Sequence, residues 1–266
     1  MRHSDIVIVT PVTPPASIQR AGACPDRMAG YPCQRAAPQQ NQILAALPFA
    51  QLRELIADLE PVWFDAGTTL IAAGDTLEAV YFPTTAIVSH VYTMADGATT
   101  EVAMIGHEGV VGMCLYPANR AITDAVVQSD GLAYRLDAQL LRHAISQGGV
   151  LPELLLSCAN TLFRQIALTT VGSQHSTMEQ KLSRWLLERL DRSPAAALKV
   201  THEHIAILLG VRRESITGAA RKLHDEGLIR CRRGVITVED RAALERRAGE
   251  CYQRPPRAQA AAAWHM

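Results

Sequence analysis

The stretch VTHEHIAILLGVRRESITGAARKLHDEGLIRCRRG, from Val200 to Gly234, joins two helical patterns to a basic hairpin pattern. Thr201 is a residue type that caps helix starts, and Gly210 permits the sharp turn between the two helical runs. Apolar residues recur at helical spacing on one face of each run: Ile205, Ala206, Leu208, Leu209, Ile216, Ala219, Ala220 and Leu223. The pattern predicts a helix-turn-helix.

The second predicted helix has a polar outer face and a charged N-terminal tip. In a helix-turn-helix the front end of this helix enters the DNA major groove. Arginine can bond guanine with two donors, glutamate can accept from cytosine, and threonine can reach a phosphate or a thymine methyl group. The candidate DNA contacts on this helix are Arg212, Arg213, Glu214, Thr217 and Arg221.

The segment LIRCRRGVITVED, which begins at Leu228, predicts a two-stranded wing with Gly234 at its tip. Arg230, Arg232 and Arg233 lie on this hairpin, where they would contact phosphates of the DNA backbone. The alternative interpretation of the two predicted helices is an ordinary helical hairpin with a solvated basic face.

The charge is unevenly distributed, although the 26 basic and 26 acidic side chains cancel. Residues 41–150 carry a net charge of −8, and residues 151–266 carry +6. A basic half joined to an acidic half supports a polyanion partner for the C-terminal half.

Cysteine usage and hydropathy point to a reducing, aqueous location. The six cysteines contain no CxxC pair, and no apolar run in the sequence itself reaches membrane length. We therefore expect a soluble, cytoplasmic protein with no membrane partner.

The chain divides into segments of different pattern. Residues 1–40 and 253–266 lack a sustained period, so we expect a disordered extension and tail. Residues 41–150 begin with short helical patterns and continue as short alternating runs, with Asp96-Gly97 as a hairpin turn. Many short strands at this spacing predict a β jelly-roll or sandwich.

A long apolar helix is predicted over residues 151–172, followed by a winged helix-turn-helix domain over 173–252. Either the helix packs on its own barrel as a core helix, or it forms a dimer seam. The candidate seam residues form one stripe: Leu155, Cys158, Leu162, Ile166 and Thr169.

Residues 44–252 resemble the Crp/Fnr family of bacterial transcription regulators. LGVRRESITGAARKLHDEGLI looks like that family's recognition motif, and VYFPTTAIVSHVYTMADGATTEVAMIGHEGVVGM looks like its cyclic-nucleotide-binding-type barrel. The resemblance implies an α+β fold of jelly-roll barrel, dimerisation helix and winged helix-turn-helix. It also implies a homodimeric, sequence-specific DNA-binding regulator that is not an enzyme. Its implied partners are double-stranded DNA, RNA polymerase and a small-molecule effector of unknown identity.

Within this resemblance, Arg213 and Glu214 fall on positions that read bases, and Thr217 falls near a third. Gly218 stands where many members of the family carry an arginine, so their target sequence cannot be transferred to this chain.

The family's phosphate cassette is altered at its first pair. Gly112-Met113 stands where the family has Gly-Glu, and methionine cannot accept a ribose hydroxyl bond as a carboxylate does. The later stretch NRAITDA retains Arg120 and also contains Thr123. We expect cyclic AMP and cyclic GMP to bind weakly or not at all. Two interpretations stay open: a barrel kept for dimerisation and domain coupling, or a pocket for another effector.

Two alternatives invoke metals. Cys24, Cys33 and Cys114 would be the ligands of an iron–sulfur cluster, but their spacing is wide and a fourth ligand is not evident. A small-molecule- or metal-binding barrel with catalytic activity would use His90, Glu101 and His107, and its C-terminal helices would serve assembly. The paired-histidine spacing of such barrels is missing, so we predict no metal and no cofactor.

Overall fold

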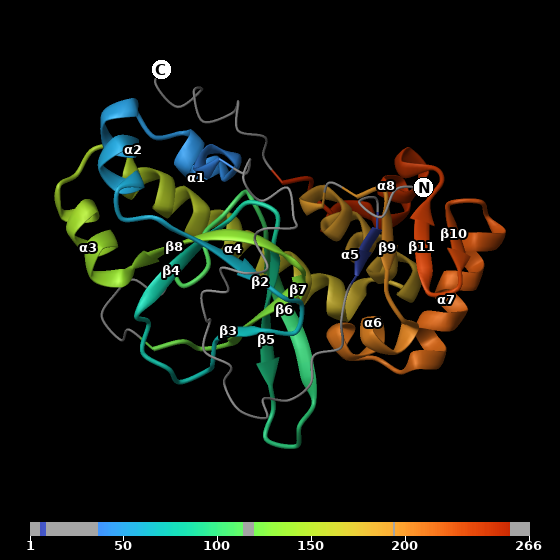
Figure 1. Ribbon diagram of the computed structural model, residues 1–266. Helices are drawn as coiled ribbons and strands as arrows, with labels where there is room; N and C mark the ends of the chain where they lie inside the picture. The colour runs from blue at the N-terminus through green and yellow to red at the C-terminus, as the bar shows by residue number, and fades with distance from the viewer. Residues whose placement is uncertain (1–5, 9–36, 114–119, 194, 256–266) are drawn as a thin grey trace.

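The computed structural model describes residues 6–8, 37–113, 120–193 and 195–255. Figure 1 shows a barrel lobe on one side, a C-terminal helical lobe on the other, and helix α4 (Leu151–His175) extending along the barrel. The predicted α+β order of barrel, long helix and winged helix-turn-helix is confirmed.

Two antiparallel sheets form the barrel, and their strands match the alternating segments of the sequence. The three-stranded sheet has the order β2-β8-β4, with bounds Glu60–Phe64, Gly131–Asp137 and Ala79–Pro83. The four-stranded sheet has the order β3-β7-β5-β6, with bounds Thr69–Ile71, Asp124–Ser129, Ile87–Thr93 and Thr99–Ile105. The side chains enclosed between the sheets are almost entirely apolar.

The predicted hairpin turn joins β5 to β6. Gly97 has a φ of 85°, and the Asp96 side chain accepts a hydrogen bond of 2.9 Å from the backbone N–H of Ala98. Because positive φ costs glycine little, this dipeptide fixes the turn and therefore the register of β6.

Short helices close the barrel: η4 (Pro38–Gln40), α1 (Gln42–Ala45), α2 (Phe49–Ile56) and α3 (Ala138–Ser146). Asn41 is fully buried and caps α1, and its amide donates to the carbonyls of Pro83 and Gly109 at 2.9 and 2.8 Å. These two bonds attach the helical cap to the barrel.

Helix α4 continues through Gly172, where the sequence pattern suggested a break. Gly172 is buried beside Cys251 within α4, so this glycine does not end the helix. By length and composition α4 is long and apolar enough to cross a membrane. Only 6% of its most apolar 18-residue stretch is buried in the protein. A single such helix is weak evidence for a span, since an exposed apolar helix also suits a protein partner.

The C-terminal lobe begins with α5 (Met178–Arg192), which Thr177 and Gln180 start through a reciprocal capping box. Its other elements are β9 (Ala197–Lys199), α6 (His202–Leu209), α7 (Arg213–Asp225), β10 (Ile229–Arg232), β11 (Val235–Val238), α8 (Arg241–Ala248) and η5 (Gly249–Cys251).

One strand of the C-terminal sheet comes from the N-terminal extension. Strand β1 (Ile6–Ile8) pairs parallel to β9, and the sheet order is β1-β9-β11-β10. This corrects the expectation of disorder throughout residues 1–40, because the open edge of β9 offers unpaired backbone groups to an added strand. Residues 9–36 and 256–266 lie outside the described residues.

Candidate nucleic-acid interface

Helices α6 and α7 have the predicted helix-turn-helix geometry. The Thr201 side chain accepts from the backbone N–H of His204 at 3.1 Å, and Gly210 ends α6 in the left-handed conformation with a φ of 63°. Ile216 and Leu223 of α7 are fully buried with Ile205 and Leu208 of α6. The inner faces are thus fixed by the core, which leaves the outer face of α7 in solvent.

The tip of α7 carries exposed charges with few internal partners. Arg212 and Glu214 make no ion pair within the described part of the chain, and Arg213 meets Glu203 only at 3.9 Å. About two turns further on, Arg221 is 83% exposed and lies 3.8 Å from Asp225. Such loosely paired guanidinium groups are available to an external anion.

Thr217 is held by two neighbours. Its hydroxyl donates to the Arg213 carbonyl oxygen at 3.1 Å, and it also contacts the Nδ1 atom of His202 at 3.1 Å. Sequence reasoning did not single out His202, which belongs to the first helix and has no motif of its own.

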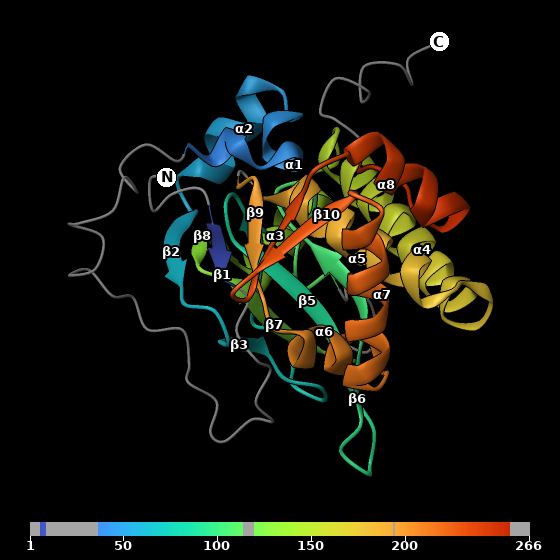
Figure 2. The ribbon, with the colours of Figure 1, turned by 90° about the vertical axis from the view of Figure 1, so that its right-hand side faces the viewer.

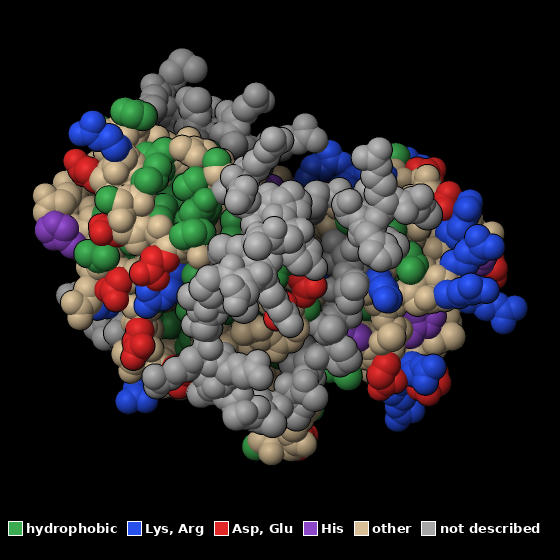
Figure 3. All heavy atoms as spheres, viewed as in Figure 1, with side chains coloured by type: hydrophobic (Ala, Val, Ile, Leu, Met, Phe, Trp, Pro, Cys, Tyr) green, Lys and Arg blue, Asp and Glu red, His purple; other side chains and the backbone are tan. Residues whose placement is uncertain are grey.

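The wing is the hairpin of β10 and β11, and its two-residue tip is Arg233-Gly234. Both tip residues have positive φ, 47° and 76°, as a tight hairpin turn requires. Arg232 and Arg233 are exposed without ion partners among the described residues, whereas Arg230 is paired with Glu239 at 3.0 Å. Figure 3 shows Lys and Arg side chains gathered at the edge of the molecule over α7 and β10.

The four candidate effector residues make contacts in different places. Gly112 has a φ of 91° and passes close to the Ala79 carbonyl of β4, whereas Met113 packs on the helical cluster of α1–α4. Arg120 is exposed and donates to the Gly74 carbonyl at 3.1 Å, and Thr123 bonds the His90 ring at 2.9 Å. These contacts do not gather the four residues around one ligand position.

Two of the three candidate ligands of the alternative metal barrel have side-chain partners within the protein. Glu101 accepts from Arg189 and from Ser89, and His90 is occupied by Thr123. Within the described ranges no three His, Cys, Asp or Glu side chains converge as metal ligands. Cys24, Cys33 and Cys114 lie outside the described residues.

The candidate seam residues on α4 pack against the protomer's own barrel and α5, as the core-helix alternative expects. Leu155 is 4% exposed and lies with Cys158 in the core formed by α1, α2, α3 and the barrel. Leu162 packs against the barrel interior, and Thr169 accepts from Arg184 at 3.1 Å. Ile166 is half-buried. The stripe is apolar because it covers the barrel, which was the alternative the sequence left open.

A different row of α4 is exposed along its whole length. Its residues are spaced alternately four and three apart, which is the heptad spacing of a helix–helix seam. They are Leu156, Asn160, Phe163, Ala167, Thr170 and Gln174. Leu156 is 64% exposed and Phe163 is 73% exposed. Figure 2 shows α4 at the outer side of the molecule, beside α8 and α7.

Helix α5 docks the C-terminal lobe on the barrel through buried charges. Arg189, 1% exposed, donates to Glu101 of β6 at 3.0 Å and stacks on the Trp185 ring at 3.9 Å. Arg192 donates to Glu108 at 2.6 Å. His204 contacts the Gln128 amide oxygen at 3.2 Å, and burial lowers the pKa of His204 to about 3. Because these pairs join residues far apart in sequence, no local sequence pattern predicts them.

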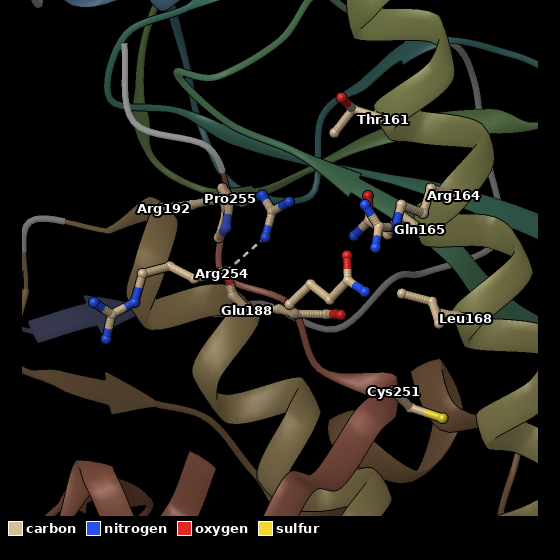
Figure 4. Close-up of a pocket in the computed structure, with 10 residues that line it drawn as sticks. Thr161, Arg164, Gln165, Leu168, Glu188, Arg192, Cys251, Arg254 and Pro255 are labelled. Carbon is tan, nitrogen blue, oxygen red and sulfur yellow. Dashed lines mark hydrogen bonds between the residues drawn. The ribbon is translucent and has the colours of Figure 1, made fainter. Parts of the chain in front are cut away.

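A cavity of about 250 Å³ lies between α4, α5 and residues 251–255. Figure 4 shows the side chains that line it. Arg164, Arg192 and Arg254 line it together with Glu188, whose pKa is raised by burial. Arg192 is committed to Glu108 and Arg254 to Glu245 at 2.6 Å, so much of the positive charge at the wall is neutralised.

The fold and the interface together define a winged helix-turn-helix protein with a nucleotide-binding-type barrel. Residues 180–247 match the Crp-like helix-turn-helix domain, and residues 61–147 match the cyclic nucleotide-binding domain. The transcriptional regulator LdrP of Thermus thermophilus is 30% identical over 137 residues, covering 47% of this chain and 70% of LdrP. The chain belongs to the Crp/Fnr family and is a DNA-binding transcriptional regulator with a cyclic-nucleotide-binding-like domain.

Two further similarities agree with this assignment. A CRP-like cAMP-activated global transcriptional regulator of Mycobacterium tuberculosis is 24% identical over 202 residues, 73% of this chain and 90% of that protein. The structure of FixK2 from Bradyrhizobium japonicum superimposes with a TM-score of 0.62 at 18% identity, covering 71% of this chain and 96% of FixK2. The latter likeness supports the fold.

Proposed function

We propose that the chain binds DNA as a homodimer in which each α7 helix reads one half-site. The observation that carries this proposal is the exposed, loosely paired tip of α7 beside Arg232 and Arg233 of the wing, which have no ion partner among the described residues. The same helix buries its opposite face in the core, so its orientation is fixed before DNA arrives. A preoriented donor set loses little entropy on binding.

The two arginine groups have different tasks. Arg213 and Glu214 lie in the first turn of α7, where they would meet base edges in the major groove. Arg212, Thr217 and Arg221 are proposed as supporting contacts on the same helix. Arg232 and Arg233 lie on the wing and would contact phosphates, which supply affinity independent of sequence.

The proposed dimer seam is the exposed row of α4. Phe163 and Leu156 supply its apolar contacts, and Asn160 occupies a position where one polar residue sets register. In the dimer this row would be covered, which accounts for Leu156 and Phe163, the two large apolar side chains that the protomer leaves exposed in it. Two half-sites roughly 34 Å apart then match the two-fold axis.

We infer that the barrel does not bind cyclic nucleotides in the ordinary way. The Mycobacterium relative is named as cAMP-activated, but here Met113 lies among apolar side chains and Arg120 is exposed to solvent. Another small-molecule effector and RNA polymerase are proposed partners, and the cytoplasm is the proposed location. No catalytic role is proposed.

The experiment is a competition titration of the full chain against an operator selected from random duplexes. Arg213→Ala should lose about 1–3 kcal/mol on the operator and much less on random DNA. Arg232→Ala should weaken both DNAs alike and reduce the salt dependence by about one phosphate contact. Arg53→Ala, which changes an exposed arginine of α2 on the barrel, is the matched control. Equal losses on both DNAs for Arg213→Ala would contradict base reading by α7.

The seam is tested by sedimentation of Phe163→Glu. A charge at this exposed position should yield monomers with weak DNA binding, whereas Thr161→Glu adds the same charge to the same helix outside the row. An unchanged dimer mass for Phe163→Glu would refute the seam.

A further inference from the structure

The two hydrogen bonds of the Thr217 hydroxyl form together only when Nδ1 of His202 carries a proton. The Thr217 hydroxyl has one hydrogen, and it donates that hydrogen to the Arg213 carbonyl oxygen at 3.1 Å. The 3.1 Å contact between Thr217 and His202 can then be a hydrogen bond only if Nδ1 of His202 is the donor. In the neutral ring the Nε2 atom is therefore an acceptor without a proton.

Protonation at Nε2 leaves this arrangement intact. Nδ1 carries a hydrogen both in this neutral form and in the imidazolium, so the bond to Thr217 persists in each state. The added proton converts Nε2 from an acceptor into a charged donor. The neutral Nε2 cannot donate a hydrogen bond to a neighbouring anion, whereas the protonated Nε2 attracts the anion and donates to it. This change needs no rearrangement of α6 or α7.

In the free protein the surroundings favour the neutral ring. Partial burial and the Arg213 guanidinium lower the pKa of His202 below its usual value. Glu203, the next residue of α6, lies 3.9 Å from Arg213 and so offsets part of that positive charge. Near neutral pH a small gain in negative potential is enough to shift the protonation of such a histidine.

DNA brings that potential to this position. His202 opens α6, and the first helix of a helix-turn-helix crosses the phosphate backbone while the second enters the groove. We propose that His202 is a proton-linked DNA contact, which takes up a proton at Nε2 from water when a backbone phosphate binds beside it. The inference rests on the DNA docking of α7 proposed above. It predicts that affinity rises as the pH falls, on any DNA sequence.

The test is fluorescence anisotropy of the full chain on a random duplex at fixed salt between pH 8 and pH 6. Affinity should rise about fivefold for each protomer over this range, as expected for one group whose pKa increases by about one unit on binding. His202→Gln keeps a donor for Thr217 but cannot titrate, so it should bind with a flat pH profile. His202→Arg should bind more tightly than the native chain at pH 8, also with a flat profile.

The matched control is His224→Gln on α7. His224 is exposed near the C-terminal end of α7, where its Nδ1 atom bonds the Ile229 carbonyl at 3.1 Å. This variant should keep the native pH dependence. A native slope in His202→Gln, or no gain for His202→Arg at pH 8, would overturn the inference while leaving DNA binding established. Absence of binding at every pH would instead refute the docking of α7 and the inference with it.

Discussion

The ion pair between Glu101 and Arg189 is the contact between the two lobes whose loss should be most costly. The Arg189 side chain is 1% exposed and that of Glu101 is 8% exposed, so neither group can regain water while the lobes stay docked. We expect Glu101→Gln to lower the free energy of unfolding by about 3–5 kcal/mol, the usual cost of leaving one buried charge unpaired.

The other contacts of Arg189 limit this loss but cannot replace the carboxylate. Its guanidinium also reaches the Gln128 oxygen at 3.4 Å and stacks on the Trp185 ring. A desolvated cation–π contact contributes about 2 kcal/mol and is already present in the native protein. The double variant Glu101→Gln/Arg189→Met removes both charges, so we expect it to be more stable than the sum of the single losses implies.

The assay is urea denaturation of the single and double variants, combined with hydrogen exchange of β6 and α6. If the free energy of separating the two lobes is smaller than the free-energy cost of the unpaired buried charge, the lobes should separate locally. Hydrogen exchange in β6 and α6 should then rise before global unfolding. Additive losses below about 1 kcal/mol together with unchanged exchange would refute the reasoning.

Three further outcomes follow from single positions. Burial lowers the pKa of His204 to about 3 and that of His90 to about 4, so both stay neutral when folded while the unfolded chain protonates below pH 6.5. The stability that each neutral histidine contributes above pH 6.5 is lost as the pH falls, by about 2 kcal/mol per histidine at pH 5. In an acid titration, the His204→Gln variant should not show the loss that comes from His204. Gly112→Ala should cost about 2 kcal/mol in denaturation, more than Gly74→Ala, because both have positive φ but only Gly112 lies close to a carbonyl. Arg233→Gly should relieve about 1 kcal/mol of backbone strain in the wing while weakening binding to random DNA; a variant that gains stability and keeps full affinity would remove Arg233 from the interface.

Elements set by local chemistry were predictable from the sequence. Thr201, Gly210 and Gly234 are required where the chain starts a helix, ends one and turns a hairpin, and each is found in that role. Asp137 caps α3 and Asp96-Gly97 turns β5 into β6 for the same reason. Such signals depend on a few neighbouring residues, so folding of the rest of the chain does not change them.

Contacts between distant residues were not predictable. Arg189 and Glu101 are 88 positions apart, and arginines on an amphipathic helix such as α5 are ordinarily solvated. Strand β1 pairs with β9 across 191 positions of the sequence, Ile6 lying opposite Ala197. His202 becomes informative only when folding brings it to Thr217, since a single histidine has no pattern of its own.

Helix α4 shows why periodicity located the helix but not the face that stays exposed in the protomer. The helix is apolar on two faces, one that covers the barrel and one that is exposed, and both repeat at nearly the same spacing. Periodicity favoured the stripe of Leu162, and its neighbour Phe163 was not singled out. Packing separates them, because Leu162 meets the barrel interior while Phe163 remains 73% exposed. A helix with both faces apolar is expected where one element must belong to a core and to a partner at once.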